Sequence, residues 1–85
     1  MKEEKIKVRL NELLKKFERT KYGTIEQKKL SARIFALREF LEKPDYNYLI
    51  ERRIEAFNML FTEKNPEVIE SYIKEIDWIL RLRCE

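Results

Sequence analysis

The sequence predicts an all-α fold, a small up-down bundle of four helices. Apolar residues recur at spacings of three and four along four segments of similar length, and three short breaks containing Gly, Pro or capping residues separate these segments. Hydrophobic residues make up 44% of the 85 positions and charged residues 41%, which is typical of packed amphipathic helices and not of disordered chains. A chain of this length holds one core, so we expect residues 1–85 to form a single helical domain.

The first helix is expected over residues 2–19. Its apolar stripe is narrow, and most of its other positions are charged. An alternative therefore stays open, in which this helix projects as an arm and the remaining three helices form the core. A short strand-like alternation also occurs here, but the helical spacing continues through the whole stripe, which consists of Ile6, Leu10, Leu13, Leu14 and Phe17.

The second helix is expected to begin just after the only glycine, Gly23, which suits a left-handed backbone conformation between two helices. Thr24 and Gln27 have the spacing of a capping box, in which the Thr24 hydroxyl accepts a hydrogen bond from the Gln27 amide. Phe35 lies away from the apolar stripe of this helix and is a spare hydrophobic residue. The stripe itself is expected to contain Leu30, Ile34, Leu37, Phe40 and Leu41.

The third helix is expected after Pro44, which ends the second helix, with Asp45 as its N-cap. Tyr48 and Met59 fall towards the side opposite its main apolar face. That face is unusually broad, so we expect this helix to be the most buried of the four. The residues on the face are Tyr46, Leu49, Ile50, Ile54, Phe57, Leu60 and Phe61.

The fourth helix is expected to begin at Asn65, Pro66 and Glu67, which are a capping residue, a proline at the first helical position and an acid facing the helix dipole. Trp78 and Leu82, four residues apart, form a second and smaller apolar stripe. The main inward stripe is expected to contain Ile69, Tyr72, Ile73, Ile76, Ile79 and Leu80.

The composition argues against an enzyme. There is no histidine, one cysteine and one glycine, so the usual general base, the common zinc motifs and the glycine-rich phosphate and dinucleotide motifs are all missing. The carboxylates at helix-face spacing lie among lysines and arginines, so we interpret them as a solvated charged face. We expect no catalytic residue, metal ligand, cofactor or small-molecule substrate. These carboxylate pairs are Glu51 with Glu55, Glu63 with Glu67, and Glu70 with Asp77.

The sequence predicts a chain that neither crosses a membrane nor is secreted. No run of 18 apolar residues exists, and residues 1–5 lack the apolar core of a secretory signal. The single Cys84 has no intramolecular partner, which is consistent with a reducing compartment. We expect a cytoplasmic location.

Large apolar residues outside the inward stripes predict a protein interface, with a protein partner or a second copy of the chain. The candidates are Phe35, Tyr48, Met59, Trp78 and Leu82, and Val8 is a further hydrophobic residue off its stripe. Trp78 and Leu82 would make a patch one helical turn long, and Trp is the residue most enriched at binding hot spots. The alternative that Trp78 closes the core against the first helix stays open.

Charge favours a second hypothesis, direct contact with nucleic acid. Residues 1–43 contain 13 Lys and Arg against 7 Asp and Glu, a formal charge of +6, while residues 44–85 contain 6 against 9, a charge of −3. Interleaved glutamates can neutralise part of the basic half, and no recognition-helix or RNA-binding motif is present. The residues expected to contact phosphates are Lys15, Lys16, Arg19, Lys21, Lys28 and Lys29.

Two segments resemble small helical accessory proteins encoded among the assembly and packaging genes of tailed bacteriophages. Residues 37–46, LREFLEKPDY, match a helix that ends in an LxxFLxxPxY turn, and residues 69–80, IESYIKEIDWIL, match a last helix rich in Ile and Leu around an acid and a Trp. The two segments, with the gap between them, span about half the chain. It implies a role in assembly or accessory binding, in a host cytoplasm or a virion, and no catalytic residue.

Overall fold

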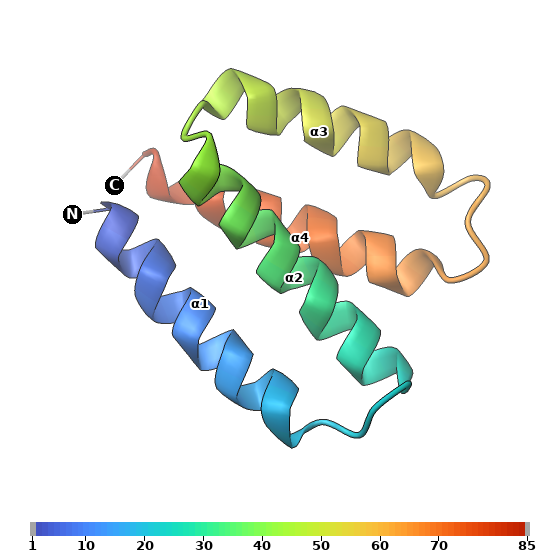
Figure 1. Cartoon of the computed structure of the whole chain (residues 1–85). Helices are drawn as coiled ribbons and strands as arrows, with labels where there is room; N and C mark the ends of the chain where they lie inside the picture. The colour runs from blue at the N-terminus through green and yellow to red at the C-terminus, as the bar shows by residue number, and fades with distance from the viewer. Residues whose placement is uncertain (1, 85) are drawn as a thin grey trace.

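A computed structural model describes residues 2–84, which form four helices and no strand. These are α1 (Lys2–Arg19), α2 (Ile25–Glu42), α3 (Tyr46–Met59) and α4 (Pro66–Leu82). Successive helices run in opposite directions within the hairpins α1–α2 and α3–α4, as Figure 1 shows. The all-α helical bundle predicted from the sequence is therefore confirmed.

Local capping chemistry sets the helix boundaries. Gly23 has a φ of 81°, so the one residue without a Cβ occupies the left-handed position of the α1–α2 turn. The Gln27 amide donates to the Thr24 hydroxyl at 3.2 Å, and the Gln27 side chain accepts from the Gly23 amide at 2.8 Å. Asp45 accepts from the amides of Asn47 and Tyr48 at the start of α3. The Gly23 turn and the Thr24 and Asp45 caps were predicted from neighbouring residues in the sequence.

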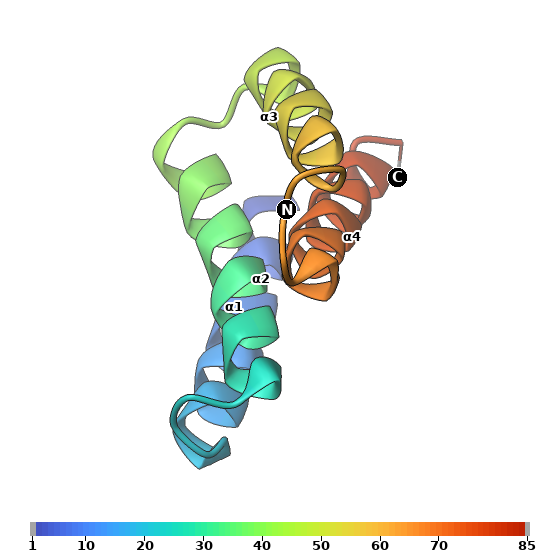
Figure 2. The same ribbon diagram turned by 90° about the vertical axis from the view of Figure 1, so that its right-hand side faces the viewer.

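The helices are arranged in the order α1, α2, α4, α3, so that α2 and α4 lie in the middle and α1 and α3 at the edges. The main packing contacts join α1 to α2, α2 to α4, and α3 to α4. Figures 1 and 2 show α3 resting on α4 at the side of the molecule away from α1. The molecule measures 34 × 30 × 19 Å, and a helix with its side chains is about 10 Å across, so its thinnest dimension spans two layers.

The core lies along α2 and α4. Ala36, Leu37, Ile76 and Ile79 are completely enclosed, and the other buried apolar residues surround them. α1 contributes Ile6 and Leu13 to the same core, so α1 packs against the other helices of the chain and does not project as an arm. The remaining buried apolar residues are Ile34, Phe40, Leu49, Ala56, Tyr72, Ile73 and Leu82.

The expectation that the third helix is the most buried was wrong. Only Leu49 and Ala56 of α3 are buried. Since α3 has one main neighbour, α4, it can bury only a narrow strip of its surface. The rest of its broad apolar face is exposed to solvent. Within residues 2–84, no helix is long and apolar enough to pass through a lipid bilayer.

Candidate functional site

Four apolar side chains form an exposed row along α3, called here the α3 stripe: Ile50, Ile54, Phe57 and Phe61. Their exposed fractions are 36%, 55%, 49% and 79%. The spacings of four, three and four residues place them on one face of a helix. Phe61 follows the end of α3, but Leu60 before it keeps helical backbone angles (φ −57°, ψ −27°), so the row continues through Phe61. The rings of Phe57 and Phe61 meet edge to face, with centroids 6.0 Å apart.

Polar contacts on both sides of α3 fix its rotation and hold the α3 stripe outward. Arg53 reaches α4, where its Nε donates to Asp77 Oδ1 at 2.6 Å, and this hydrogen bond raises the pKa of Arg53. Arg52 reaches α2, where its Nε donates to Glu39 Oε2 at 3.0 Å. Turning α3 to bury the stripe would break both contacts, so the exposure of the stripe is built into the packing.

Glu39 of α2 is the centre of a polar cluster between α2, α3 and α4. Its carboxylate accepts a hydrogen bond from the Tyr72 hydroxyl at 2.6 Å and one from Tyr48 at 3.4 Å, in addition to the one from Arg52. Burial raises the pKa of the Tyr72 hydroxyl, and the hydrogen bond to Glu39 raises it further. This cluster ties α2, α3 and α4 together with polar groups that bond one another, which suits a structural role.

An apolar groove of about 550 Å³ lies where α2, α3 and α4 meet, on the other side of α3 from the stripe. Phe35 and Met59, both predicted as interface residues, lie at its edges and are about half exposed. The structure thus brings these two predicted residues together from different helices. The groove is also lined by Lys28, Ser31, Ala32, Arg52, Glu55, Ala56, Glu63, Asn65, Val68, Ile69 and Tyr72.

Leu82 was wrongly predicted as a surface anchor, because it is buried in the core. The first turn of α1 reaches the last turn of α4 there, and Lys2 Nζ donates to the Arg83 carbonyl at 2.8 Å. Trp78 is half-buried, packs against the core and lies 4.2 Å from the Arg9 guanidinium. Tyr48 is half-buried between Glu39 and the Lys43 ammonium. The predicted Trp78 and Leu82 patch is therefore not a surface patch.

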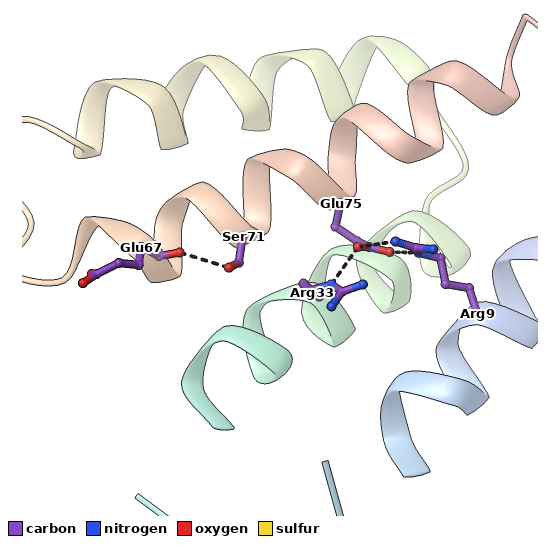
Figure 3. A network of polar contacts seen from close by, with 5 residues as sticks. All are labelled: Arg9, Arg33, Glu67, Ser71 and Glu75. Atoms are coloured by element: carbon purple, nitrogen blue, oxygen red, sulfur yellow. Dashed lines mark hydrogen bonds and ion pairs between the residues drawn. The ribbon is translucent and has the colours of Figure 1, made fainter. Parts of the chain in front are cut away.

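One carboxylate that was not expected from the sequence is almost completely enclosed. Glu75 of α4 is 1% exposed and accepts hydrogen bonds from Arg9 of α1 and Arg33 of α2, as Figure 3 shows. Arg9 Nη2 donates at 3.2 Å and Arg33 Nε at 3.0 Å, and a further bond joins Arg9 Nε to the other oxygen of Glu75. Both arginines keep part of their side chains in solvent. Glu75 thus joins α4 to α1 and α2 through its two arginine partners.

The predicted nucleic-acid residues gather at one end of the molecule, around the α1–α2 turn, and form what is called here the basic tip: Lys15, Lys16, Arg19, Lys21, Lys28 and Lys29. Among residues 2–84, no ion pair involves any of these six side chains. Tyr22, in the turn beside them, is 90% exposed, the most of any large hydrophobic residue described. The basic tip therefore combines available cations with an available aromatic ring.

Comparisons with family models, with curated proteins and with solved structures give no match to this chain. The surfaces of the chain itself are therefore the guide to its function. The residues of the α3 stripe belong to the broad apolar face that the sequence shows for the third helix. That face was expected to be buried, whereas the structure leaves the stripe exposed.

Proposed function

We propose that this protein is a non-enzymatic protein-interaction module that uses α3 as its contact surface. The observation that supports the proposal is the α3 stripe, a continuous row of large apolar side chains in solvent on a helix whose rotation is fixed. Contiguous exposed apolar surface is uncommon on monomeric soluble proteins and marks interaction sites. Two of the four residues are phenylalanines, and aromatic residues are enriched in interfaces.

The fixed orientation of α3 makes the stripe suitable for binding a partner protein. Asp77 holds Arg53 and Glu39 holds Arg52, so binding would not have to order α3 first. A preorganised surface loses less conformational entropy on association, which leaves more of the apolar burial as net affinity. The polar residues beside the stripe, Glu51 and Asn58, supply a hydrophilic rim.

The test is a comparison of partners captured from the native source by the wild-type chain and by an Ile54→Glu/Phe57→Glu variant. Val8→Glu is the matched control, because Val8 is equally exposed but lies on α1. The stripe variant is expected to lose specific partners that the wild type and the Val8→Glu control both retain. If all three chains capture the same proteins in the same amounts, α3 is not the contact surface.

A second candidate function, contact with nucleic acid, is supported by the unpaired cations and the exposed Tyr22 of the basic tip. Residues 15–29 hold six cations against two acids, Glu18 and Glu26. Fluorescence anisotropy with a labelled oligonucleotide at low and moderate salt tests it, using Lys15→Glu/Lys28→Glu as the variant. Phosphate contacts require affinity that falls steeply with salt and falls again in the variant. Absence of binding at low salt would exclude this candidate.

Both candidates agree with the assembly or accessory role that the resemblance to small bacteriophage proteins implies. In that setting we place the protein in the host cytoplasm or in a virion, and otherwise in the cytoplasm of its own cell. The interaction module is the preferred proposal, because its surface is apolar, continuous and rigid.

A further inference from the structure

The α3 stripe has a symmetry that identifies one occupant. We propose that α3 pairs with α3 of a second copy of this chain, antiparallel and about a two-fold axis; this inference rests on the proposed function and names its partner. The residues of the stripe are spaced four, three and four apart, so the spacing of the row is the same when it is read in reverse. A two-fold axis through that midpoint places Ile50 opposite Phe61, and Ile54 opposite Phe57, of the other copy. An interface between identical surfaces needs this kind of self-complementarity.

The order of side-chain sizes favours the antiparallel direction. Both isoleucines stand in the first half of the stripe and both phenylalanines in the second half. Antiparallel pairing therefore gives every layer one Ile and one Phe, and the layers have nearly equal volume. Parallel pairing would put Phe against Phe at one end and Ile against Ile at the other. Facing positions that alternate large and small side chains pack with fewer voids.

The charges beside the stripe are compatible with the antiparallel direction. Glu51 and Asn58 border one edge of the stripe, and Arg53 borders the other. In the antiparallel arrangement Glu51 lies nearest Asn58 of the second copy, and Arg53 lies nearest Leu60 of the second copy. The antiparallel interface therefore brings no two like charges together, and like charges at close range would destabilise an interface. Antiparallel helices also place the positive end of one helix dipole beside the negative end of the other, which is favourable.

The area available limits the strength of this pairing. A large side chain has a surface on the order of 200 Å², and about half of each of the four is exposed. The stripe therefore contributes roughly 400 Å² per copy and roughly 800 Å² for the pair. This is less than the roughly 1,200–2,000 Å² of a standard stable interface. The dimer is therefore expected to be reversible, with a Kd in the micromolar range or above. Its formation depends on protein concentration, so monomer and dimer exchange in solution.

Sedimentation velocity over a concentration series measures this equilibrium. The wild type is expected to dimerise with rising concentration, and Ile54→Glu/Phe57→Glu is expected to weaken dimerisation by more than about tenfold, because each charged side chain would be placed in an apolar layer. Val8→Glu is the control and is expected to dimerise like the wild type. Circular dichroism checks that all three chains are equally helical. A wild type that stays monomeric at millimolar concentration overturns the proposal.

Disulfide trapping tests the direction of pairing. In a Cys84→Ser background, a chain with Ile50→Cys is mixed with a mass-tagged chain with Phe61→Cys and oxidised. Antiparallel pairing is expected to yield mainly the 50–61 crosslink between different chains, whereas dominant 50–50 and 61–61 crosslinks would contradict it. Stripe-dependent capture of other proteins by a strictly monomeric chain would refute only the self-pairing. A wild-type chain that neither dimerises nor captures any protein through the stripe would refute the role of α3 as well.

Discussion

Arg9 on α1 and Glu75 on α4 are joined by two hydrogen bonds, although 66 positions separate them in the chain. Arg33 of α2 shares the same carboxylate. The energetics of this triad are asymmetric. Each arginine can regain solvent if it loses its partner, because its side chain is partly exposed, whereas Glu75 is enclosed and depends on them. Removing a buried charge's partners costs far more than removing one exposed member of a pair.

We predict that Arg9→Ala and Arg33→Ala each lower the free energy of unfolding by about 1–2 kcal/mol, since one arginine still satisfies Glu75. The double variant is expected to lose about 3–5 kcal/mol, more than the two single effects together, because an unpaired carboxylate then stays buried. Urea denaturation of the four chains measures the coupling. Additive losses would mean that the two arginines act independently. Trp78 fluorescence should change with Arg9→Ala in particular, because Arg9 lies over its ring.

The buried Tyr72 hydroxyl predicts a loss of stability in alkali. The pKa of Tyr72 is raised above its ordinary value of 10.0, mainly by burial and then by the hydrogen bond to Glu39. The unfolded chain therefore releases the phenolic proton more easily than the folded chain. Stability from this group is fully present below pH 10 and falls as pH rises through 10 towards the higher folded value.

Tyr72→Phe is expected to flatten this decline and to lower stability at neutral pH, because Glu39 loses a donor. Chemical denaturation between about pH 8 and 11, a range that brackets the ordinary tyrosine pKa, compares the two chains. Tyr22→Phe is the control, since Tyr22 is almost wholly exposed and its removal should leave the alkaline decline unchanged. Parallel declines in all three chains would assign the effect to other groups.

The packing of α3 on α4 predicts opposite outcomes for two large residues, Leu49 near the start of α3 and Phe61 just after its end. Leu49→Ala is expected to destabilise the protein by about 2–5 kcal/mol, because Leu49 is buried and its removal leaves a cavity. Phe61→Ala removes a larger side chain but is expected to change the stability of the dilute monomer by less than about 0.5 kcal/mol, since Phe61 is exposed. Thermal unfolding at low protein concentration measures both. A large loss with Phe61→Ala would mean that α3 buries its stripe.

The fold could be predicted from the sequence because its signals are local. Helix periodicity, Gly23 and the Thr24 and Asp45 caps each depend on a few neighbouring residues. Burial of α3 could not be predicted in the same way, because it depends on how many helices pack against α3, and periodicity does not encode that number. The sequence pattern marks an apolar face equally well whether the face meets a neighbouring helix or solvent.

The burial of Leu82 and Glu75 depends on tertiary packing, but the spacing of residues along α4 gave a sign of it. Tyr72, Glu75, Ile79 and Leu82 follow one another at helical spacing and all lie on the inward side of α4. A glutamate on such a row indicates a buried charge that needs a cation from another helix, and the alignment of Leu82 with this row indicated core rather than surface. Which cations reach Glu75 was not predictable, because it depends on how α1 and α2 cross α4.

Two N-caps give the last prediction, since they look alike in sequence and differ in structure. Asp45 accepts hydrogen bonds from two amides of α3, whereas the Asn65 side chain makes no capping hydrogen bond to α4. Asp45→Ala is therefore expected to cost about 1 kcal/mol of unfolding free energy, and Asn65→Ala only a few tenths, because Pro66 has no amide hydrogen to satisfy and already holds a helical φ. Urea denaturation of both variants decides the matter. Equal losses would show that the cap at Asn65 forms in solution, and a negligible loss for Asp45→Ala would show that α3 is held by its packing on α4 alone.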